Sequence, residues 1–236
     1  MEKSYSNISE NLKRIRFEIG ESIQKYGRDE DDVKLMAVTK TVPPEAVNEA
    51  IALGVRLLGE SKAQELLNKY DSYDKQGVAI HFIGHLQSNK VRQIIGKVSM
   101  VESVDSVSLA REIDRQAQKN SIKTDVLIEV NIGGEASKFG VLPQHLESLL
   151  AELSKMPYIS VKGLMAIPPF SDDVVQTEKY FSAMHELFVD IRGKNIDNVS
   201  MDVLSMGMSG DFKEAIKHGS NVIRIGTALF GARDYS

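Results

Sequence analysis

Hydrophobic and polar positions along the chain form short runs typical of buried strands, separated by stretches with helical spacing. The strand-like runs are rich in β-branched residues and lie at 33–39, 55–59, 79–84, 97–104, 125–132, 159–167, 201–207 and 221–226. Between them, apolar residues recur at helical intervals, which predicts helices that include 88–96, 106–119, 143–155 and 174–192. The pattern therefore predicts a regular alternation of strands and helices.

Local signals mark the ends of several further helices. The segments PEAVNEAIALG and DFKEAIKHG are expected to end at Gly54 and Gly219, because glycine readily terminates a helix. Ser61 and Gln64 have the spacing of a capping box and predict a helix that starts between them. The first 19 residues read as an amphipathic helix that precedes the first strand.

Strict alternation of strands and helices predicts a parallel sheet with right-handed crossovers. Eight such units favour a TIM-type (β/α)8 barrel with an extra N-terminal helix, and a length of 236 residues suits that fold. An open doubly wound sheet is the alternative. No linker rich in proline, glycine or serine divides the chain, so we expect residues 1–236 to form a single domain.

Composition and charge narrow the classes of function. A formal net charge of −4 gives no basic surface, so nucleic acid is not expected as a partner. The absence of cysteine excludes a disulfide framework, a cysteine nucleophile and a thiolate metal site, and no metal site is expected. No apolar run approaches the roughly 20 residues of a membrane span. We expect a cytoplasmic protein and, because no long apolar surface stripe is evident, a monomer.

In a barrel of this kind, the carboxyl ends of all strands open on one face, and that face carries the functional site. The residues at the expected strand ends are Lys40, Glu60, Gly84, His85, Asn131, Met165, Ala166, Ser205, Gly226 and Thr227.

Lys40 is the most unusual of these residues, because it places a cation at the end of a buried apolar strand. Side chains alternate along a strand, so Met36, Val38 and Lys40 share one face; if the first two fill the barrel, Lys40 points into its mouth. A partly desolvated amine has a lowered pKa and can attack an aldehyde to form a Schiff base. A strand-end lysine whose ammonium group simply reaches solvent is the alternative.

Two glycine-containing turns near the C-terminus could bind a phosphate. The segment LSMGMSGDFKEAI predicts a strand, a turn and a helix that begins near Ser209, and IRIGTALFG predicts a short helix that starts at Thr227 after Gly226. Free backbone N–H groups at such turns attract anions, and threonine adds a hydroxyl donor. Barrels often bind phosphate after strands seven and eight, although two ordinary helix caps would look the same.

Arg224 lies in the last strand and shares a face with Val222, which places a guanidinium inside the barrel. A buried arginine requires a partner. One candidate is the nitrogen of a bound pyridine ring, to which a permanently protonated guanidinium would donate a hydrogen bond. An ion pair with Glu129 or Asp202 is the alternative.

Six segments follow one another along the chain: AVTKTVP, HFIGHLQSNK, VNIGGEASKFG, GLMAIPP, LSMGMSGDFKEAI and VIRIGTALFGARDYS. Together, and in this order, they resemble the pyridoxal 5′-phosphate homeostasis protein family, of the YggS/PROSC type. The resemblance runs from about residue 8 to the C-terminus and implies a barrel like the N-terminal domain of alanine racemase.

The resemblance also implies which residues bind the cofactor. It implies that pyridoxal 5′-phosphate (PLP) is held as an aldimine on Lys40, with Arg224 near the ring nitrogen. The phosphate contacts that it implies are from Ser209, Gly210, Gly226 and Thr227, and the ring pocket that it implies is lined by Ile83, Asn131 and Met165.

Two positions depart from the family pattern, and a third is open to interpretation. Ser61 stands where the family usually has asparagine, so a cofactor contact from that position is in doubt. His85 stands where proline is common and is either a surface loop residue or a group that titrates at the mouth. Lys138 is expected to be solvated, with a second PLP-reactive amine as the alternative.

The function implied by the resemblance is vitamin B6 homeostasis: a non-catalytic protein that buffers PLP or supplies it to apo PLP-dependent enzymes. Alanine racemase needs a second β-rich domain and a tyrosine base from a partner subunit, for which we see no room, so turnover is not expected. A small PLP-dependent amino-acid racemase is the alternative. A third possibility is a scaffold that binds only protein partners.

Overall fold

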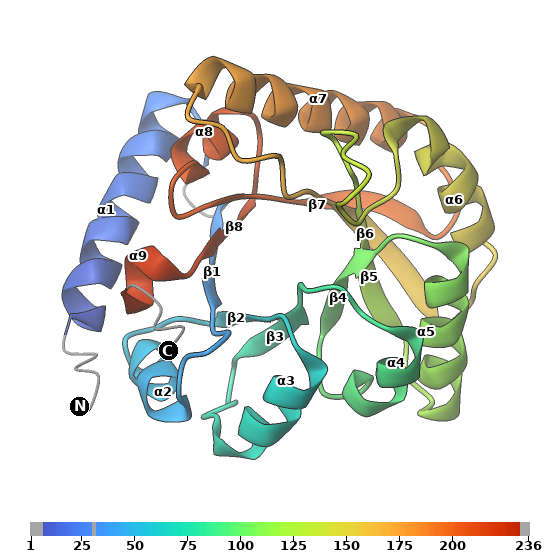
Figure 1. Cartoon of the computed structure of the whole chain (residues 1–236), viewed down its shortest axis with the longest axis horizontal. Coiled ribbons are helices and arrows are strands. Elements are labelled where there is room, and N and C mark those ends of the chain that lie inside the picture. The colour runs from blue at the N-terminus through green and yellow to red at the C-terminus, as the bar shows by residue number, and fades with distance from the viewer. Residues whose placement is uncertain (1–6, 30–31, 232–236) are drawn as a thin grey trace.

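The structure is a computed structural model that describes residues 7–29 and 32–231, and its centre is a closed barrel of parallel strands (Figure 1). The strands are β1 (Lys34–Val38), β2 (Leu57–Glu60), β3 (Ala79–Phe82), β4 (Met100–Val104), β5 (Thr124–Glu129), β6 (Ile159–Met165), β7 (Val199–Met208) and β8 (Val222–Ile225). Strand β8 pairs with β1 and closes the barrel, with Lys34 opposite Val222 and Ala37 opposite Ile225. The predicted TIM-type barrel is confirmed, and the open sheet is excluded.

Helices connect successive strands and form a ring around the barrel (Figure 1). They are α1 (Ile8–Lys25), α2 (Pro44–Ala52), α3 (Ala63–Lys69), α4 (Ser88–Ile94), α5 (Val107–Lys119), α6 (Leu146–Leu153), α7 (Val174–Gly193), α8 (Phe212–Lys217) and α9 (Thr227–Phe230), with short 3-10 helices η2 (Tyr70–Ser72) and η3 (Pro143–His145). Gly54 and Gly219 follow α2 and α8 with positive φ angles, as expected of glycines that end helices.

The additional N-terminal helix is confirmed as α1, although residues 1–6 of the expected segment lie outside the described residues. Figure 1 shows α1 alongside α8 and the single-turn α9. The Asn11 side-chain amide donates to the Leu229 carbonyl at 3.0 Å, and Arg28 donates to the Ser220 carbonyl at 2.6 Å. Helix α1 therefore covers the side of the barrel that the short α9 leaves open.

The strands separate two apolar regions, one under the helices and one inside the barrel. In β1, Ala37 packs in the outer region, whereas Met36 and Val38 pack in an inner cluster. Gly59 of β2 faces the inner cluster, and a Cβ there would lie 2.5 Å from Met36 Sδ and 2.9 Å from Ile83 Cδ1. Glycine is needed at this position because any side chain would overfill the interior.

One predicted helix cap and one predicted helix start were wrong. Helix α3 begins at Ala63, and no side chain caps it, because Ser61 still belongs to the loop after β2, where its backbone packs directly against Gly84. Helix α8 begins at Phe212 rather than near Ser209, because the Ser209 hydroxyl is used by the turn after β8.

Candidate functional site

Lys40 lies at the carboxyl end of the barrel, two residues beyond Val38, and is half-buried. Strand β1 pairs directly with β8, where Met36 is opposite Arg224. Closure of the barrel therefore brings the strand that carries Lys40 beside the strand that carries Arg224, although the two residues are 184 positions apart in sequence.

Thr39, the residue before Lys40, is held by hydrogen bonds to residues of β2 and α3. The Thr39 hydroxyl donates to Glu60 Oε1 at 2.6 Å, and Lys69 Nζ donates to the Thr39 carbonyl at 3.0 Å. Tyr73 donates to the same Glu60 oxygen at 2.6 Å. Burial raises the pKa of Glu60, while these two hydroxyl donors oppose the rise.

The residue after Lys40 has a strained backbone. Thr41 has a φ of 62°, which is rare for a β-branched residue, and its N–H donates to the Glu65 side chain. Glu65 also pairs with Lys69. Because both neighbours of Lys40 are held by the β2–α3 region, its backbone position is well defined.

Arg224 is buried inside the barrel, with only 3% of its surface exposed. Its Nη1 donates to Ser205 Oγ at 2.8 Å and its Nη2 to the Ala166 carbonyl at 2.7 Å. Within the described part of the chain, no carboxylate lies at ion-pair distance from it, and Asp202 pairs with Lys162 instead. The two ion pairs considered for Arg224 are therefore not formed.

The charge of Arg224 is balanced at longer range. Burial lowers the pKa of Arg224, and the carboxyl groups of Glu102, Glu129 and Asp211 oppose that effect. Glu102 is linked to Arg224 through Ser205, whose hydroxyl donates to Glu102 Oε2 at 2.6 Å.

The hydrogen-bonded chain from Arg224 continues down the barrel interior. Glu102 Oε1 lies 2.6 Å from His81 Nδ1, and His81, Glu102, Ser205 and Arg224 are all buried. We call these four residues the axial chain. Sequence reasoning did not assign a role to His81 or Glu102, although each is a polar residue at an inward position of a strand and could have been found on that basis.

Glu129 is a second group near Arg224 whose properties depend on the fold. It ends β5, is 8% exposed and lies opposite Met165 of β6. Burial, together with repulsion from Asp105, raises the pKa of Glu129 to about 7, and Arg224 opposes the rise. The carboxyl end of the barrel therefore contains an acid that titrates near neutral pH.

The turns after β7 and β8 meet at Ser209. Its hydroxyl accepts hydrogen bonds from the N–H groups of Gly226 and Ala228, both at 3.3 Å. The N–H groups of Ser209 and Gly210 donate to no acceptor within residues 7–29 and 32–231. Thr227 is exposed at the start of α9. Backbone donors and two hydroxyl groups thus converge in an arrangement that suits an anion.

The remaining predicted ring-pocket residues also lie at this end. Ile83 packs in the inner cluster with Met36 and Val38, and Met165 is fully buried inside the barrel. The Asn131 side chain donates to the Glu135 carbonyl at 2.9 Å and so anchors the loop after β5.

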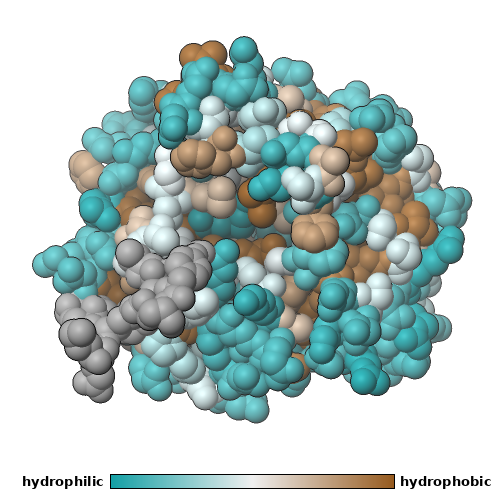
Figure 2. Space-filling view, viewed as in Figure 1, coloured by the Kyte–Doolittle hydropathy of each residue, from teal (hydrophilic) through white to brown (hydrophobic). Residues whose placement is uncertain are grey.

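The loop after β5 also contacts the loop after β3. His85 stacks on Phe139, with ring centroids 3.7 Å apart and planes 14° apart, so His85 joins two loops at the mouth. Lys138, in the same loop as Phe139, is exposed. Figure 2 shows the molecule hollowed near its centre, with hydrophobic residues inside a more hydrophilic outer ring.

The described residues contain neither a metal site nor a membrane-spanning helix. No group of three histidine or acidic side chains there could hold a metal ion. No helix there is both long and apolar enough to cross a membrane.

Comparison with known proteins identifies the family. Residues 6–234 match the family model described as alanine racemase, N-terminal domain. A pyridoxal phosphate homeostasis protein from Aquifex aeolicus is 42% identical over 97% of this chain and 100% of its own length. The Escherichia coli protein of the same name is 36% identical over 98% of this chain and 99% of its own length.

Solved structures agree with this relationship. PipY from Synechococcus elongatus, solved with PLP bound, is 30% identical, with a TM-score of 0.82 over 95% of this chain and 100% of PipY. Alanine racemase from Corynebacterium glutamicum shares only the fold, with 16% identity and a TM-score of 0.70 over 98% of this chain and 62% of the racemase. The sequence resemblance is thus confirmed, and the chain belongs to the pyridoxal phosphate homeostasis protein family.

Proposed function

We propose that this chain binds PLP at the carboxyl end of its barrel and serves in the homeostasis of that cofactor. Lys40 is the proposed point of attachment, and the turns after β7 and β8 are the proposed phosphate site. PLP supplies a reactive aldehyde and an electron-withdrawing ring; the protein supplies binding, orientation and a controlled environment. PipY, which is 30% identical over its whole length and was solved with PLP bound, supports this proposal.

The observation that carries the proposal is the convergence of three chemical groups at one end of the barrel. Lys40 offers an amine after β1, and the adjacent β8 carries Arg224. Ser209 links the turns after β7 and β8. The N–H groups of Ser209 and Gly210 donate to no acceptor in the described residues and are available for an anion. An aldehyde, a ring nitrogen and a phosphate each need one of these partners, and PLP contains all three.

The phosphate contacts that we propose come from Ser209, Gly210, Gly226 and Thr227. A dianion suits this position because hydroxyl and backbone donors face it, and hydrogen bonds to charged acceptors are stronger than neutral ones. Gly210 has nothing within 4 Å of where a Cβ would lie, so the backbone there is open to approach.

For the ring, we propose Arg224 as the partner of the pyridine nitrogen and Ile83, Asn131 and Met165 as pocket residues. Arg224 has five N–H donors, and two of them have protein acceptors. A guanidinium remains protonated, so the ring nitrogen opposite it would accept a hydrogen bond and stay unprotonated.

We propose further that the protein stores and supplies PLP without catalytic turnover, as a cytoplasmic monomer that serves apo PLP-dependent enzymes. The names of its relatives support a homeostatic role. An unprotonated ring is a weaker electron sink than one paired with a carboxylate, which does not favour fast chemistry on a bound amino acid.

The decisive experiment uses the purified full-length protein loaded with PLP. Borohydride reduction followed by peptide mapping should place the mass adduct on Lys40, and Lys40→Ala should lose both the adduct and the visible absorbance of the bound cofactor. The matched control is Lys138→Ala, which removes an exposed lysine near the same mouth and should retain both. An adduct that persists in Lys40→Ala would contradict the proposed attachment site.

The same preparation tests for turnover. Incubation with a panel of L-amino acids and chiral analysis should detect no steady formation of the D-isomer. Sustained D-isomer production that disappears in Lys40→Ala would instead support the alternative function, a small PLP-dependent racemase.

A further inference from the structure

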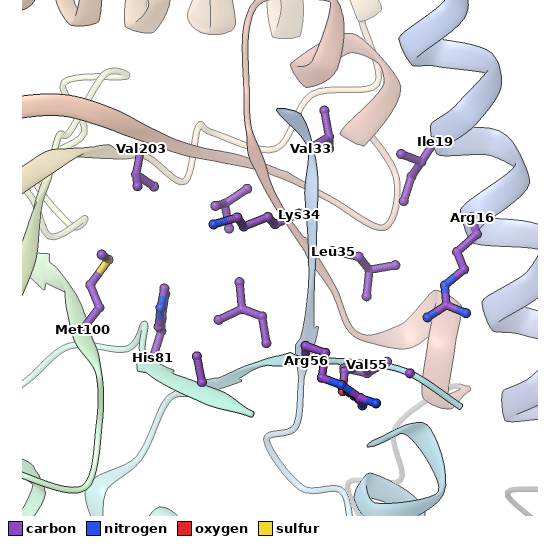
Figure 3. A pocket seen from close by; sticks show the side chains of 14 residues that line it. Arg16, Ile19, Val33, Lys34, Leu35, Val55, Arg56, His81, Met100 and Val203 are labelled. Carbon is purple, nitrogen blue, oxygen red and sulfur yellow. Dashed lines mark hydrogen bonds between the residues drawn. The ribbon is translucent and has the colours of Figure 1, made fainter. Parts of the chain in front are cut away.

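The amino end of the barrel, opposite the Lys40 face, holds a cavity of about 560 Å³ (Figure 3). We call it the amino-end cavity. Five strands contribute their first residues to its wall: Lys34, Leu57, Ala79, Met100 and Val222. Helix α1 and the loop before β2 complete the wall on one side (Figure 3). The cavity is therefore built by the fold itself and lies outside the proposed PLP site.

Both the size and the lining of the cavity suit a small molecule. Small-molecule sites span roughly 300–1,000 Å³ and are mostly apolar, with a few polar groups that orient the ligand. Here the apolar wall includes Leu57, Met100 and Val203. An apolar cavity of this size is unusual at this end of the barrel, where side chains serve mainly stability.

The charged groups of the cavity are all basic. Its lining in the described chain includes Arg16, Lys34 and Arg56 but no aspartate or glutamate. Arg56 is already bound by the carbonyls of Ile51 and Val55, at 2.7 and 2.9 Å. Figure 3 shows Lys34 extending across the cavity from β1, so its ammonium group is placed to meet an anion.

His81 gives the cavity a polar inner wall. Its Nδ1 is engaged with Glu102 at 2.6 Å, which leaves Nε2 as the ring nitrogen that a ligand could use. Glu102 connects His81 to Ser205 and then to Arg224. The axial chain thus joins the amino-end cavity to the opposite face of the barrel.

Helix orientation limits the charge of any ligand in this cavity. The helices run antiparallel to the strands, so their C-termini, with partial negative charge, lie at the amino end. A dianion is disfavoured there, while one negative charge beside Lys34 is tolerated. An apolar body would bury surface against Leu57, Met100 and Val203.

We propose that the amino-end cavity is a second ligand site for a small organic monocarboxylate with an apolar body. Its carboxylate lies beside Lys34, and its apolar body lies against the inner wall. The second part of the proposal is that a ligand in this cavity alters the environment of Arg224 through the hydrogen bonds of the axial chain. Only this second part rests on the proposed PLP function.

Phenylacetate is a suitable probe because it has no amine to react with PLP and no phosphate to compete at the β7 and β8 turns. Its neutral counterpart is 2-phenylethanol. Ligand-observed NMR and calorimetric titration of the full-length protein without PLP should show phenylacetate binding more tightly than the alcohol. Lys34→Met should weaken phenylacetate binding about fivefold and leave the alcohol unaffected, because only the charge interaction is lost.

Val203→Phe should abolish binding of both probes by filling the cavity, and Ala79→Leu provides the same test if the first variant does not fold. The matched control is Lys155→Met, which removes an exposed lysine paired with Glu152 on the outer surface and should not change binding. Equal affinity for phenylacetate and 2-phenylethanol would overturn the proposed site. So would unchanged phenylacetate binding in Lys34→Met, or in a folded Val203→Phe or Ala79→Leu protein.

The second measurement uses the protein loaded with PLP. Saturating phenylacetate should shift the absorbance of the bound cofactor, and Glu102→Gln should remove this shift while phenylacetate still binds. An unchanged spectrum in the wild-type protein would overturn the transmission to Arg224. Because the first measurement needs no PLP, failure of the proposed PLP function would be recognised separately.

Discussion

The two ends of the barrel are built from the same eight strands but differ in their chemistry. The carboxyl end carries Lys40, Glu129 and the turn after β7, where the N–H groups of Ser209 and Gly210 donate to no acceptor in the described residues. At the amino end, mostly apolar residues surround a cavity that Lys34 extends across, and its charged lining is basic.

The polarity of the backbone accounts for much of this difference. In a (β/α)8 barrel, helices begin at the carboxyl end of the strands and finish at the amino end, so unpaired N–H groups gather at one face and unpaired carbonyls at the other. A phosphate group is stabilised at the first face and opposed at the second. The direction of the backbone therefore makes the two ends of one barrel favour different anions.

The axial chain is what the two ends share. Side chains in such barrels usually fill the interior with apolar layers, but here the buried Glu102 accepts a hydrogen bond from Ser205 and lies 2.6 Å from His81 Nδ1. Substitutions in the axial chain and at the carboxyl end test this contrast between the two ends.

Glu102→Gln should have the largest effect, with a loss of about 2–4 kcal/mol in the free energy of unfolding. It removes the carboxylate that most strongly offsets the burial of the Arg224 charge and leaves bonds in the axial chain poorly paired. Urea denaturation of the protein without PLP measures the loss. The matched control, Glu152→Gln, removes an exposed carboxylate that pairs with Lys155 and should leave the midpoint unchanged. Equal midpoints for both variants would contradict a structural role for the axial chain.

Glu129→Gln should change how stability depends on pH. The pKa of Glu129 is raised from its ordinary value of 4.5 to about 7, so the folded state holds this proton more tightly than the unfolded state does. The contribution of Glu129 to the free energy of unfolding is therefore fully present below pH 4.5, falls as the pH rises and is lost above pH 7. The total change is about 3 kcal/mol, which Glu129→Gln should remove.

Denaturation midpoints measured between pH 4 and pH 9 test this expectation. The control is Asp202→Asn, which changes a carboxylate at the amino end of the barrel that is 3.9 Å from Lys162. It should keep the wild-type loss of stability between pH 5 and pH 8. If the Glu129→Gln protein also loses stability between pH 5 and pH 8, the loss must come from a group other than Glu129.

Ser209→Ala combined with Thr227→Val should have the smallest effect, and only on retention of PLP. Loss of two hydroxyl donors to a phosphate should weaken binding by about 1–3 kcal/mol, while backbone donors remain. Equilibrium dialysis of the loaded protein measures the change. Ser200→Ala removes a serine from the amino end of the same strand, β7, and should not alter retention. If the wild-type protein, the double variant and Ser200→Ala retain PLP equally, the phosphate is not bound by the hydroxyl groups of these turns.

Most of the fold could be predicted from hydrophobic periodicity. All eight strands were found within a few residues of their observed bounds, because buried parallel strands are continuous apolar runs. Helix starts were less predictable. Ser61 and Ser209 have the sequence of helix caps but serve as loop residues, since loop packing and the neighbouring turn determine what their polar groups contact.

The site was predictable where a residue is unusual for its position in the strand. Lys40 and Arg224 are cations in, or just beyond, apolar strands. Alternation along the strand was enough to place Arg224 inside the barrel, and Lys40 lies half-buried at the carboxyl end, two residues after β1. The partner of Arg224 was not predictable, because Ser205 and Ala166 approach it only through strand pairing. The same holds for the pKa of Glu129, which depends on burial by surrounding elements.

The sequence by itself determined the order of strands and helices, the inward direction of Arg224 and the family of the chain, because these depend on local patterns. Only the tertiary structure decided which residues meet across the barrel. It joined Ser209 to the turn at Gly226, linked His81 to Arg224 through Glu102 and left a cavity at the amino end. The physical reason is that closing the barrel fixes long-range contacts and burial, which no local pattern encodes.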